Sequence, residues 1–320
     1  LPFSFLHRLH HWSLSTPDAP AICFLSTPNN DANYLTNTIN YTYRELFSSA
    51  VNIADTILKP LKLPSGARVL LVYPPSPNFL PAFLACLLAD IVAVPVFPPD
   101  PSKTKTDSHT AAFSSIIQSS GSTVALTDTY YSRMKSLSSM KPGAKNNTLH
   151  SEKGIKWVVT DSNTKKQKTY LDKLGHVKAD ALSKSLLPSE VDIIRDDTLT
   201  SLASTRMAFL QYTSGSTSLP KGVTISLQNL SHNLLTITNA LKADQSTIVV
   251  SWLPQYHDMG LIGSYLAVYT QEEEEFTPRH FNSFKDVNNG LKPCHILKAH
   301  TSKHQTSHSS YSLKKLIRKP

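Results

Sequence analysis

Apolar positions change their spacing repeatedly along the first 130 residues. Continuous apolar runs at residues 68–73, 91–97 and 123–127 are typical of strands that are covered on both faces. Segments with helical spacing lie around these runs, at residues 43–58, 78–89 and 110–118. Thr42 and Glu45 have the spacing of a capping box at the start of the first helix. Strands that alternate with helices of this length predict an α/β fold built on doubly wound, mostly parallel sheets.

The pattern weakens in the middle of the chain and then returns. Residues 132–196 are largely polar and rich in lysine, which predicts solvated loops around one strand at 155–160. Further apolar runs predict strands at 206–213, 223–227 and 247–253, with a helix at 228–241. We expect the last of these strands, TIVVSWL, to be buried.

The most membrane-like stretch covers residues 79–97. It is long enough to cross a bilayer, but Pro81, Asp90 and Pro95 interrupt it. A buried helix followed by a buried strand explains the same pattern, so we predict no membrane span. The N-terminal sequence LPFSFLHRLHHW has no continuous apolar core of the kind found in signal peptides.

Composition narrows the class of protein without choosing a function. The 320 residues are 40% hydrophobic and 17% charged, which is a globular composition. The net charge of +9 suits nucleic acid and phosphate metabolites alike. The lysine-rich segments lack interleaved aromatic residues, so we interpret them as solvated surface and expect no nucleic-acid partner. Three widely separated cysteines indicate neither a zinc site nor a disulfide framework, which favours a reducing, cytoplasmic location.

The stretch LQYTSGSTSLPKGV, residues 210–223, has the ingredients of a phosphate-binding loop. Such a loop needs backbone N–H groups, short hydroxyl side chains, glycine and a cation. The residues that supply them are Thr213, Ser214, Gly215, Ser216, Thr217, Lys221 and Gly222. It is not a Walker A loop, because Pro220 precedes the lysine and Gly222 follows it. The alternative is an ordinary Ser/Thr-rich turn between two strands.

A second motif, SWLPQYHDMGLIG, follows the predicted strand at 247–253. His257 is either a histidine satisfied in the core or part of a ligand pocket. Asp258 precedes an apolar segment and is suited to cap a helix. Met259, Gly260 and Gly263 either permit close packing or shape a ligand tunnel. Both motifs follow strands, where open α/β sheets bind their ligands.

The sequence YTSGSTSLPKGVTIS resembles the phosphate-loop signature of the adenylate-forming enzymes, with Ser218 where most members have glycine. The second motif and VAVPVFPPDP are similar to the corresponding blocks of fatty acyl-AMP ligases, and the similarity extends from about residue 16 to 268. The resemblance implies that ATP and Mg²⁺ are bound, and that a fatty acid is activated as acyl-adenylate for an acyl carrier protein. Fatty acyl-CoA ligases of the same superfamily and a non-catalytic acyl- or nucleotide-binding relative are the alternatives. The pocket residues that it implies are Tyr256, His257, Asp258, Met259 and Gly260, with His257 as the candidate catalytic residue.

The resemblance also divides the chain. Residues 1–15 are expected to be an N-terminal extension, 16–270 a partial AMP-binding domain, and 271–320 an aberrant, disordered basic tail. The family's magnesium-binding glutamate is not recognisable in the sequence. The catalytic lysine, which the family carries on its C-terminal lid domain, is not recognisable either. We therefore expect this chain to be an inactive fragment, with a tail from a frameshift or splicing error or from a natural truncated relative.

Overall fold

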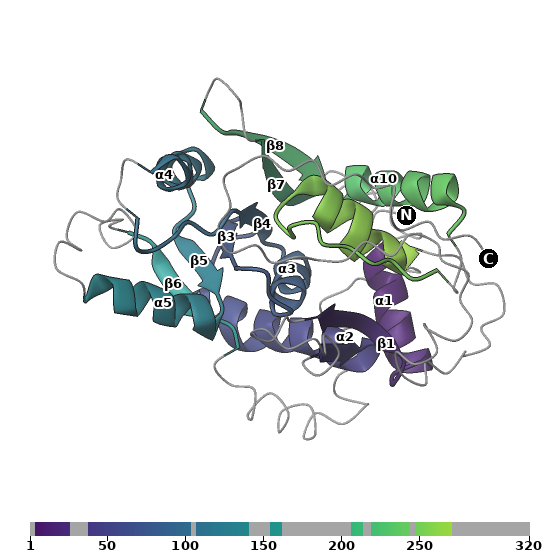
Figure 1. The fold of residues 1–320 in the computed structure, drawn as a ribbon. Coiled ribbons are helices and arrows are strands. Elements are labelled where there is room, and N and C mark those ends of the chain that lie inside the picture. The colour runs from purple at the N-terminus through teal and green to yellow at the C-terminus, as the bar shows by residue number, and fades with distance from the viewer. Residues whose placement is uncertain are drawn as a thin grey trace, which may run out of the picture.

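A six-stranded sheet forms the centre of the fold (Figure 1). The structure is a computed structural model, and it describes residues 4–25, 38–103, 107–140, 154–161, 206–213, 219–243 and 247–270. The strand order is β6-β5-β3-β4-β7-β8. The bounds are β3 (Arg68–Val72), β4 (Val92–Val96), β5 (Val124–Thr127), β6 (Lys156–Val159), β7 (Met207–Thr213) and β8 (Lys221–Ser226). All neighbours are parallel except β7 and β8, so the predicted α/β fold with a mostly parallel sheet is confirmed.

Helices cover both faces of this sheet. One hydrophobic core contains Val69 and Leu71 of β3, and it packs against α1, α2, α3 and α10. The other contains Leu70 and Val72 of the same strand, and it packs against α4 and α5. Because successive side chains of a strand point to opposite faces, this alternation establishes a doubly wound sheet. The helix bounds are α1 (Ser4–Ser15), α2 (Tyr43–Ile53), α3 (Phe79–Leu88), α4 (Ser108–Ser120), α5 (Thr129–Ser139) and α10 (Leu227–Leu241).

Local signals fix the ends of α2 and α3. Thr42 and Glu45 form the predicted capping box, and the helix continues as a π-helix (Ala54–Leu58) and a 3-10 helix (Lys59–Leu61).

Every residue of α3 is buried, which explains its membrane-like sequence. Asp90 lies beyond the end of α3 and forms an ion pair with Arg206, just before β7. Within the described ranges, no helix is long and apolar enough to cross a membrane.

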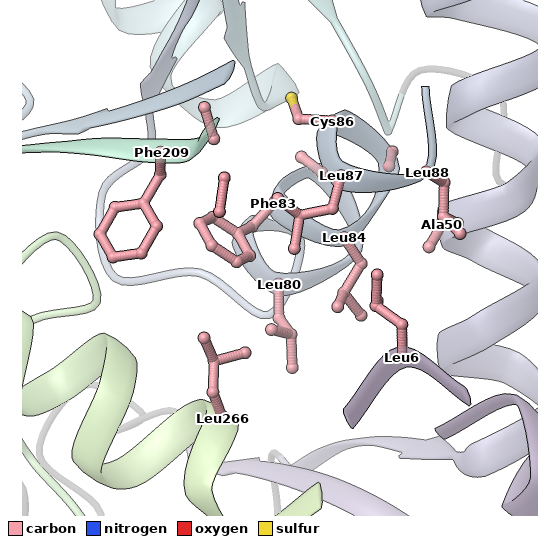
Figure 2. Close-up of a cluster of buried hydrophobic side chains, with 14 of the residues drawn as sticks. Leu6, Ala50, Leu80, Phe83, Leu84, Cys86, Leu87, Leu88, Phe209 and Leu266 are labelled. Carbon is pink, nitrogen blue, oxygen red and sulfur yellow. The ribbon is translucent and has the colours of Figure 1, made fainter. Parts of the chain in front are cut away.

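The larger core joins segments that are far apart in the sequence. Figure 2 shows Leu80, Phe83 and Leu84 of α3 among residues from α1, α2, β7 and the segment that ends at Leu266. The ring of Phe83 lies 5.7 Å from that of Phe209 in β7. Leu6 of α1 and Leu266 reach the same cluster from other sides (Figure 2). The N-terminal helix and the segment after the second motif are therefore parts of one core.

Several elements were not predicted from the sequence. α1 lies within residues 1–15, which were expected to form an extension, yet its Phe5, Leu6 and Leu9 are buried. An antiparallel pair follows it, β1 (Pro20–Leu25) and β2 (Thr38–Thr42). α5 reaches into the polar region that was interpreted as loops. The division of the chain at residues 15 and 270 stays a prediction, and residues 271–320 lie outside the described ranges.

The prediction of a buried strand at residues 247–253 is wrong. These residues have no strand pairing, and Ile248, Val250 and Trp252 are exposed to solvent in the structure. The run has the β-branched and aromatic residues that strands favour. A strand is buried, however, only where neighbouring strands take up its N–H and C=O groups and other side chains cover it. Within the described part of the chain, the sheet ends at β6 and β8 and does not reach this segment.

Candidate functional site

The sheet has a topological switch point between β3 and β4. The chain leaves β3 through α3 on one face of the sheet, and it leaves β4 through α4 on the other. Adjacent parallel strands whose connections leave to opposite faces open a crevice at their carboxyl ends. Tyr73 and Phe97, which follow β3 and β4, lie at this position. Both motifs of the sequence are found nearby.

The first motif runs from β7 to β8, which pair as antiparallel strands of a hairpin. Thr213 at the end of β7 is the register partner of Lys221 at the start of β8, and both residues are exposed. The hydroxyl and the ammonium group thus come from directly opposite positions at the mouth of one hairpin. The other predicted members of the loop, Ser214, Gly215, Ser216 and Thr217, lie outside the described residues. Their role in phosphate binding stays a prediction.

Gly222 has a packing role within this hairpin. A Cβ atom at this position would lie 2.9 Å from Cζ of Tyr212, its cross-strand partner. The hydroxyl of Tyr212 is 2.7 Å from Oγ of Ser119 in α4, and this hydrogen bond ties the hairpin to the helix. Glycine therefore leaves room for a ring that fixes the hairpin against α4.

The second motif forms a tight turn at residues 254–257, which we call the bridging turn. The N–H of His257 donates to the carbonyl of Pro254 at 3.0 Å and closes the turn. Gln255 is only 2% exposed, and its Nε2 donates to the carbonyls of Tyr73 at 3.1 Å and Pro74 at 2.6 Å. These carbonyls lie just beyond β3, where no N–H group of a described neighbouring strand pairs with them, so the side chain of Gln255 supplies the donor. The turn is thus anchored at the switch point of the sheet.

Tyr256 connects the bridging turn with β4 and β7, the next two strands of the sheet after β3. Its ring meets the edge of Phe97, after β4, with centroids 5.4 Å apart. Phe97 in turn stacks on His109 of α4 at 4.3 Å. The backbone carbonyl of Tyr256 accepts a hydrogen bond from Nε2 of Gln211 in β7 at 3.1 Å. Partial burial of the phenol raises the pKa of Tyr256, so the neutral, hydrogen-bonding form is held over a wide pH range.

His257 and Asp258 lie next to each other on the surface of the site. Nδ1 of His257 is 2.6 Å from Oδ1 of Asp258, and both side chains are more than half exposed. This excludes the interpretation of His257 as a histidine satisfied in the core. A carboxylate at this distance favours a proton on Nδ1, which leaves Nε2 as the nitrogen that can accept a hydrogen bond. Asp258 also accepts from the N–H of Met259 at 2.7 Å, as expected of a residue that begins a helix.

Gly260 and Met259 have different surroundings at the start of the following helical segment (Met259–Leu266). A Cβ atom on Gly260 would lie 2.1 Å from the carbonyl oxygen of Pro254, whereas a Cβ atom on Gly263 would meet nothing within 4 Å. Gly260 therefore permits close packing of the segment against the bridging turn. Met259 is exposed in the structure. Figure 1 shows this segment, in yellow-green, lying close to α10.

Four residues of the site were not identified from the sequence as site residues. Gln211 and Gln255 hold the bridging turn, and Phe97 and His109 form an aromatic chain with Tyr256. The sequence offered one signal for these residues, which is the polar Gln211 inside the otherwise apolar strand pattern AFLQY.

Among the described residues, no three His, Cys, Asp or Glu side chains are grouped so that they could hold a metal ion.

Residues 9–286 match the model of the AMP-binding enzyme family. This chain belongs to that family. Over 244 residues it is 34% identical to the medium-chain-fatty-acid–acyl-carrier-protein ligase JamA of Moorena producens (strain JHB), covering 76% of this chain and 34% of JamA. It is 30% identical to the ligase TtuA of Teredinibacter turnerae, named for the same activity, covering 82% of this chain and 40% of TtuA.

A solved member of the group shares the fold. This is the fatty acyl-adenylate ligase from L. pneumophila in complex with acyl adenylate and pyrophosphate, with a TM-score of 0.59 and 28% sequence identity. The match covers 83% of this chain and 38% of that ligase. This chain thus spans between a third and two fifths of the length of these relatives, and it corresponds to part of their N-terminal region.

Proposed function

We propose that the protein to which this chain corresponds activates a fatty acid with ATP. A carboxylate oxygen attacks the α-phosphorus and displaces pyrophosphate, which gives acyl-adenylate. The thiol of a carrier-protein phosphopantetheine then attacks the acyl carbonyl and releases AMP. The observation that supports this proposal most strongly is the direct link between the two motifs, from Gln211 in β7 to Tyr256 in the bridging turn.

The arrangement of charges is suited to phosphoryl chemistry. Reactions of this kind depend mainly on positioning and on neutralisation of charge. Lys221 provides a cation and Thr213 a hydroxyl at the mouth of the hairpin. In this proposal His257 and Tyr256 line the part of the site where the acyl carboxylate and the nucleotide meet. Magnesium would enter bound to ATP, and we assign no step to it because the described residues offer no cluster of ligands.

The names of the relatives favour a carrier protein as the acceptor of the acyl group. JamA and TtuA are both named as fatty-acid–acyl-carrier-protein ligases. A cytoplasmic location suits such an enzyme and agrees with the free cysteines Cys23 and Cys86. Incubation with carrier protein and with coenzyme A, followed by analysis of the thioester formed, separates this proposal from a CoA ligase.

Nucleotide binding by the 320-residue chain tests the phosphate site directly. Calorimetric titration with ATP is expected to show binding, and K221A is expected to weaken it about tenfold to a hundredfold, the worth of one charge-assisted hydrogen bond. K156A is the matched control, because Lys156 is an exposed lysine on β6 at the opposite edge of the sheet. Equal affinity of wild type and K221A contradicts the site. Fatty-acid-dependent exchange of pyrophosphate into ATP tests the whole protein's reaction.

A further inference from the structure

The bridging turn contacts the carboxyl ends of three adjacent strands. The strands β3, β4 and β7 are consecutive in the sheet. Gln255 of the turn donates to the carbonyls after β3, and the ring of Tyr256 packs on Phe97 after β4. Gln211 of β7 donates to the carbonyl of Tyr256. The third contact differs from the others, because it comes from the strand that leads into the phosphate loop.

The position of Gln211 in β7 explains why its side chain reaches the turn. Leu210 and Tyr212 pack in the core on the α4 side of the sheet, and Phe209 packs in the core on the α3 side. Alternation along the strand therefore places Gln211 on the face that it shares with Phe209. Leu261 and Leu266, which follow the turn, are buried in the same core. Gln211 thus lies between the sheet and the segment that carries the second motif.

Gln211 is also coupled mechanically to the mouth of the hairpin. It pairs with Val223 in the ladder, and the next two pairs are Tyr212 with Gly222 and Thr213 with Lys221. Two residues of a strand span about 7 Å. A displacement of Thr213 and Lys221 is therefore transmitted to Gln211 along a short, hydrogen-bonded ribbon. The hydrogen bond from Gln211 then passes this displacement to Tyr256, and His257 is the next residue of the turn.

We propose that Gln211 is a positioning residue that couples the phosphate hairpin to the bridging turn, so that ATP and the fatty acid bind cooperatively. This inference rests on the proposed function. Each ligand orders one end of the Gln211–Tyr256 connection, and the second ligand then binds to a site that is already ordered. Gln211 contributes to binding through the turn and not through contact with either ligand.

Replacement of Gln211 by methionine tests this role. Methionine keeps the length of the side chain but donates no hydrogen bond. The variant is expected to fold, because Oε1 of Gln211 is buried with no partner among the described residues, and methionine removes that unpaired group. Q211N is a second variant, whose shorter amide stops short of the Tyr256 carbonyl. Q228M makes the same change at an exposed position of α10 and is the matched control.

Two measurements on the 320-residue chain decide the outcome. Hydrogen exchange in peptides covering residues 253–262 is expected to rise about threefold to tenfold in Q211M and Q211N, the worth of one hydrogen bond, with no change in Tm. The dissociation constant for ATP is then measured with and without decanoate. Decanoate is expected to tighten ATP binding in wild type and Q228M, and this gain is expected to fall about threefold to tenfold in both Gln211 variants.

The possible failures are distinguishable. Absence of ATP binding by the wild-type chain contradicts the phosphate site proposed for this chain, whereas loss of fatty-acid-dependent pyrophosphate exchange in the whole protein contradicts the proposed function. Wild-type ATP binding that decanoate does not change contradicts the cooperative coupling. If decanoate tightens ATP binding equally in wild type and both Gln211 variants, Gln211 has no positioning role, whatever the exchange data show. Unfolding of both variants, seen as a loss of the thermal transition, shows that the bond is structural and also overturns the inference.

Discussion

The ring of Tyr212 occupies the space that a side chain on Gly222 would need. A Cβ atom on Gly222 would lie 2.9 Å from Cζ and 3.1 Å from the hydroxyl oxygen of Tyr212. The same hydroxyl is hydrogen-bonded to Ser119 at 2.7 Å. The absence of a side chain at Gly222 thus lets Tyr212 bond the β7–β8 hairpin to α4.

Gly222→Ala is expected to displace Tyr212 and to break its bond with Ser119. The clash involves the far end of a side chain, so the hairpin remains and the loss is about 1 kcal/mol of unfolding free energy. Urea unfolding of G222A, S119A and the double variant measures this. In the S119A background the alanine is expected to cost less, because the hydrogen bond is already absent. Strictly additive effects would show that the ring does not move.

Gly260→Ala is expected to be far more damaging than Gly263→Ala. A Cβ atom on Gly260 meets the backbone oxygen of Pro254 at 2.1 Å, and a backbone atom cannot rotate away. We expect a loss of about 3 kcal/mol, at the upper end of overpacking effects. A Cβ atom on Gly263 would meet no other atom within 4 Å, so G263A is the control. Because alanine favours a helix over glycine, G263A is expected to change the free energy of unfolding by at most a gain of about 1 kcal/mol. Thermal unfolding of the two variants compares them, and similar Tm values would contradict the packing of Gly260.

The exposed run at residues 247–253 is expected to reduce the solubility of this chain. Ile248 and Val250 are 49% and 40% exposed, and Trp252 is also exposed. Apolar segments with high β-propensity associate when they are open to solvent. The double variant Ile248→Ser with Val250→Ser is expected to lower light scattering on concentration and to leave Tm unchanged. A lower Tm would show that these side chains are buried in solution.

The sequence determined the local features of the fold more completely than the distant ones. The capping box of Thr42 and Glu45 and the capping role of Asp258 depend on neighbouring residues, and both were predicted. The bond from Gln255 to Tyr73 joins residues that are 182 positions apart, so neither local pattern indicated it. The run at 247–253 was mispredicted for the same reason, because its burial depends on strands elsewhere in the chain.

The candidate site shows the same distinction. Thr213 and Lys221 were chosen for their chemistry, and the hairpin places them opposite each other. Gln211 was passed over, because a polar residue in an apolar strand pattern signals that the position is unusual but does not indicate which residue it contacts. Its function follows from a contact with Tyr256, 45 residues later, which the topology creates.

Asp128 is expected to make stability depend on pH in a direction opposite to that of most carboxylates. It follows β5, begins α5, and accepts a hydrogen bond from the N–H of Tyr131 at 2.8 Å. Burial raises the pKa of Asp128 above its ordinary value of 3.8, and the nearby Asp161 adds to this, although bonds from Tyr131 and Ser76 oppose it. The folded state therefore binds more protons than the unfolded state, and this group's contribution to stability falls as the pH rises through the raised pKa.

Asn at position 128 keeps the oxygen that caps α5 and removes the buried charge. D128N is expected to gain stability relative to wild type as the pH rises from acidic values towards pH 7, because the wild-type chain must then bury a charge that the amide lacks. D128A lacks the cap as well and is expected to be about 1 kcal/mol less stable than D128N at every pH. Urea unfolding of the three proteins across this range provides the comparison. If D128N loses stability relative to wild type as the pH rises, the ionised carboxylate is favoured in the fold, and its bonds to Tyr131 and Ser76 outweigh the cost of burial.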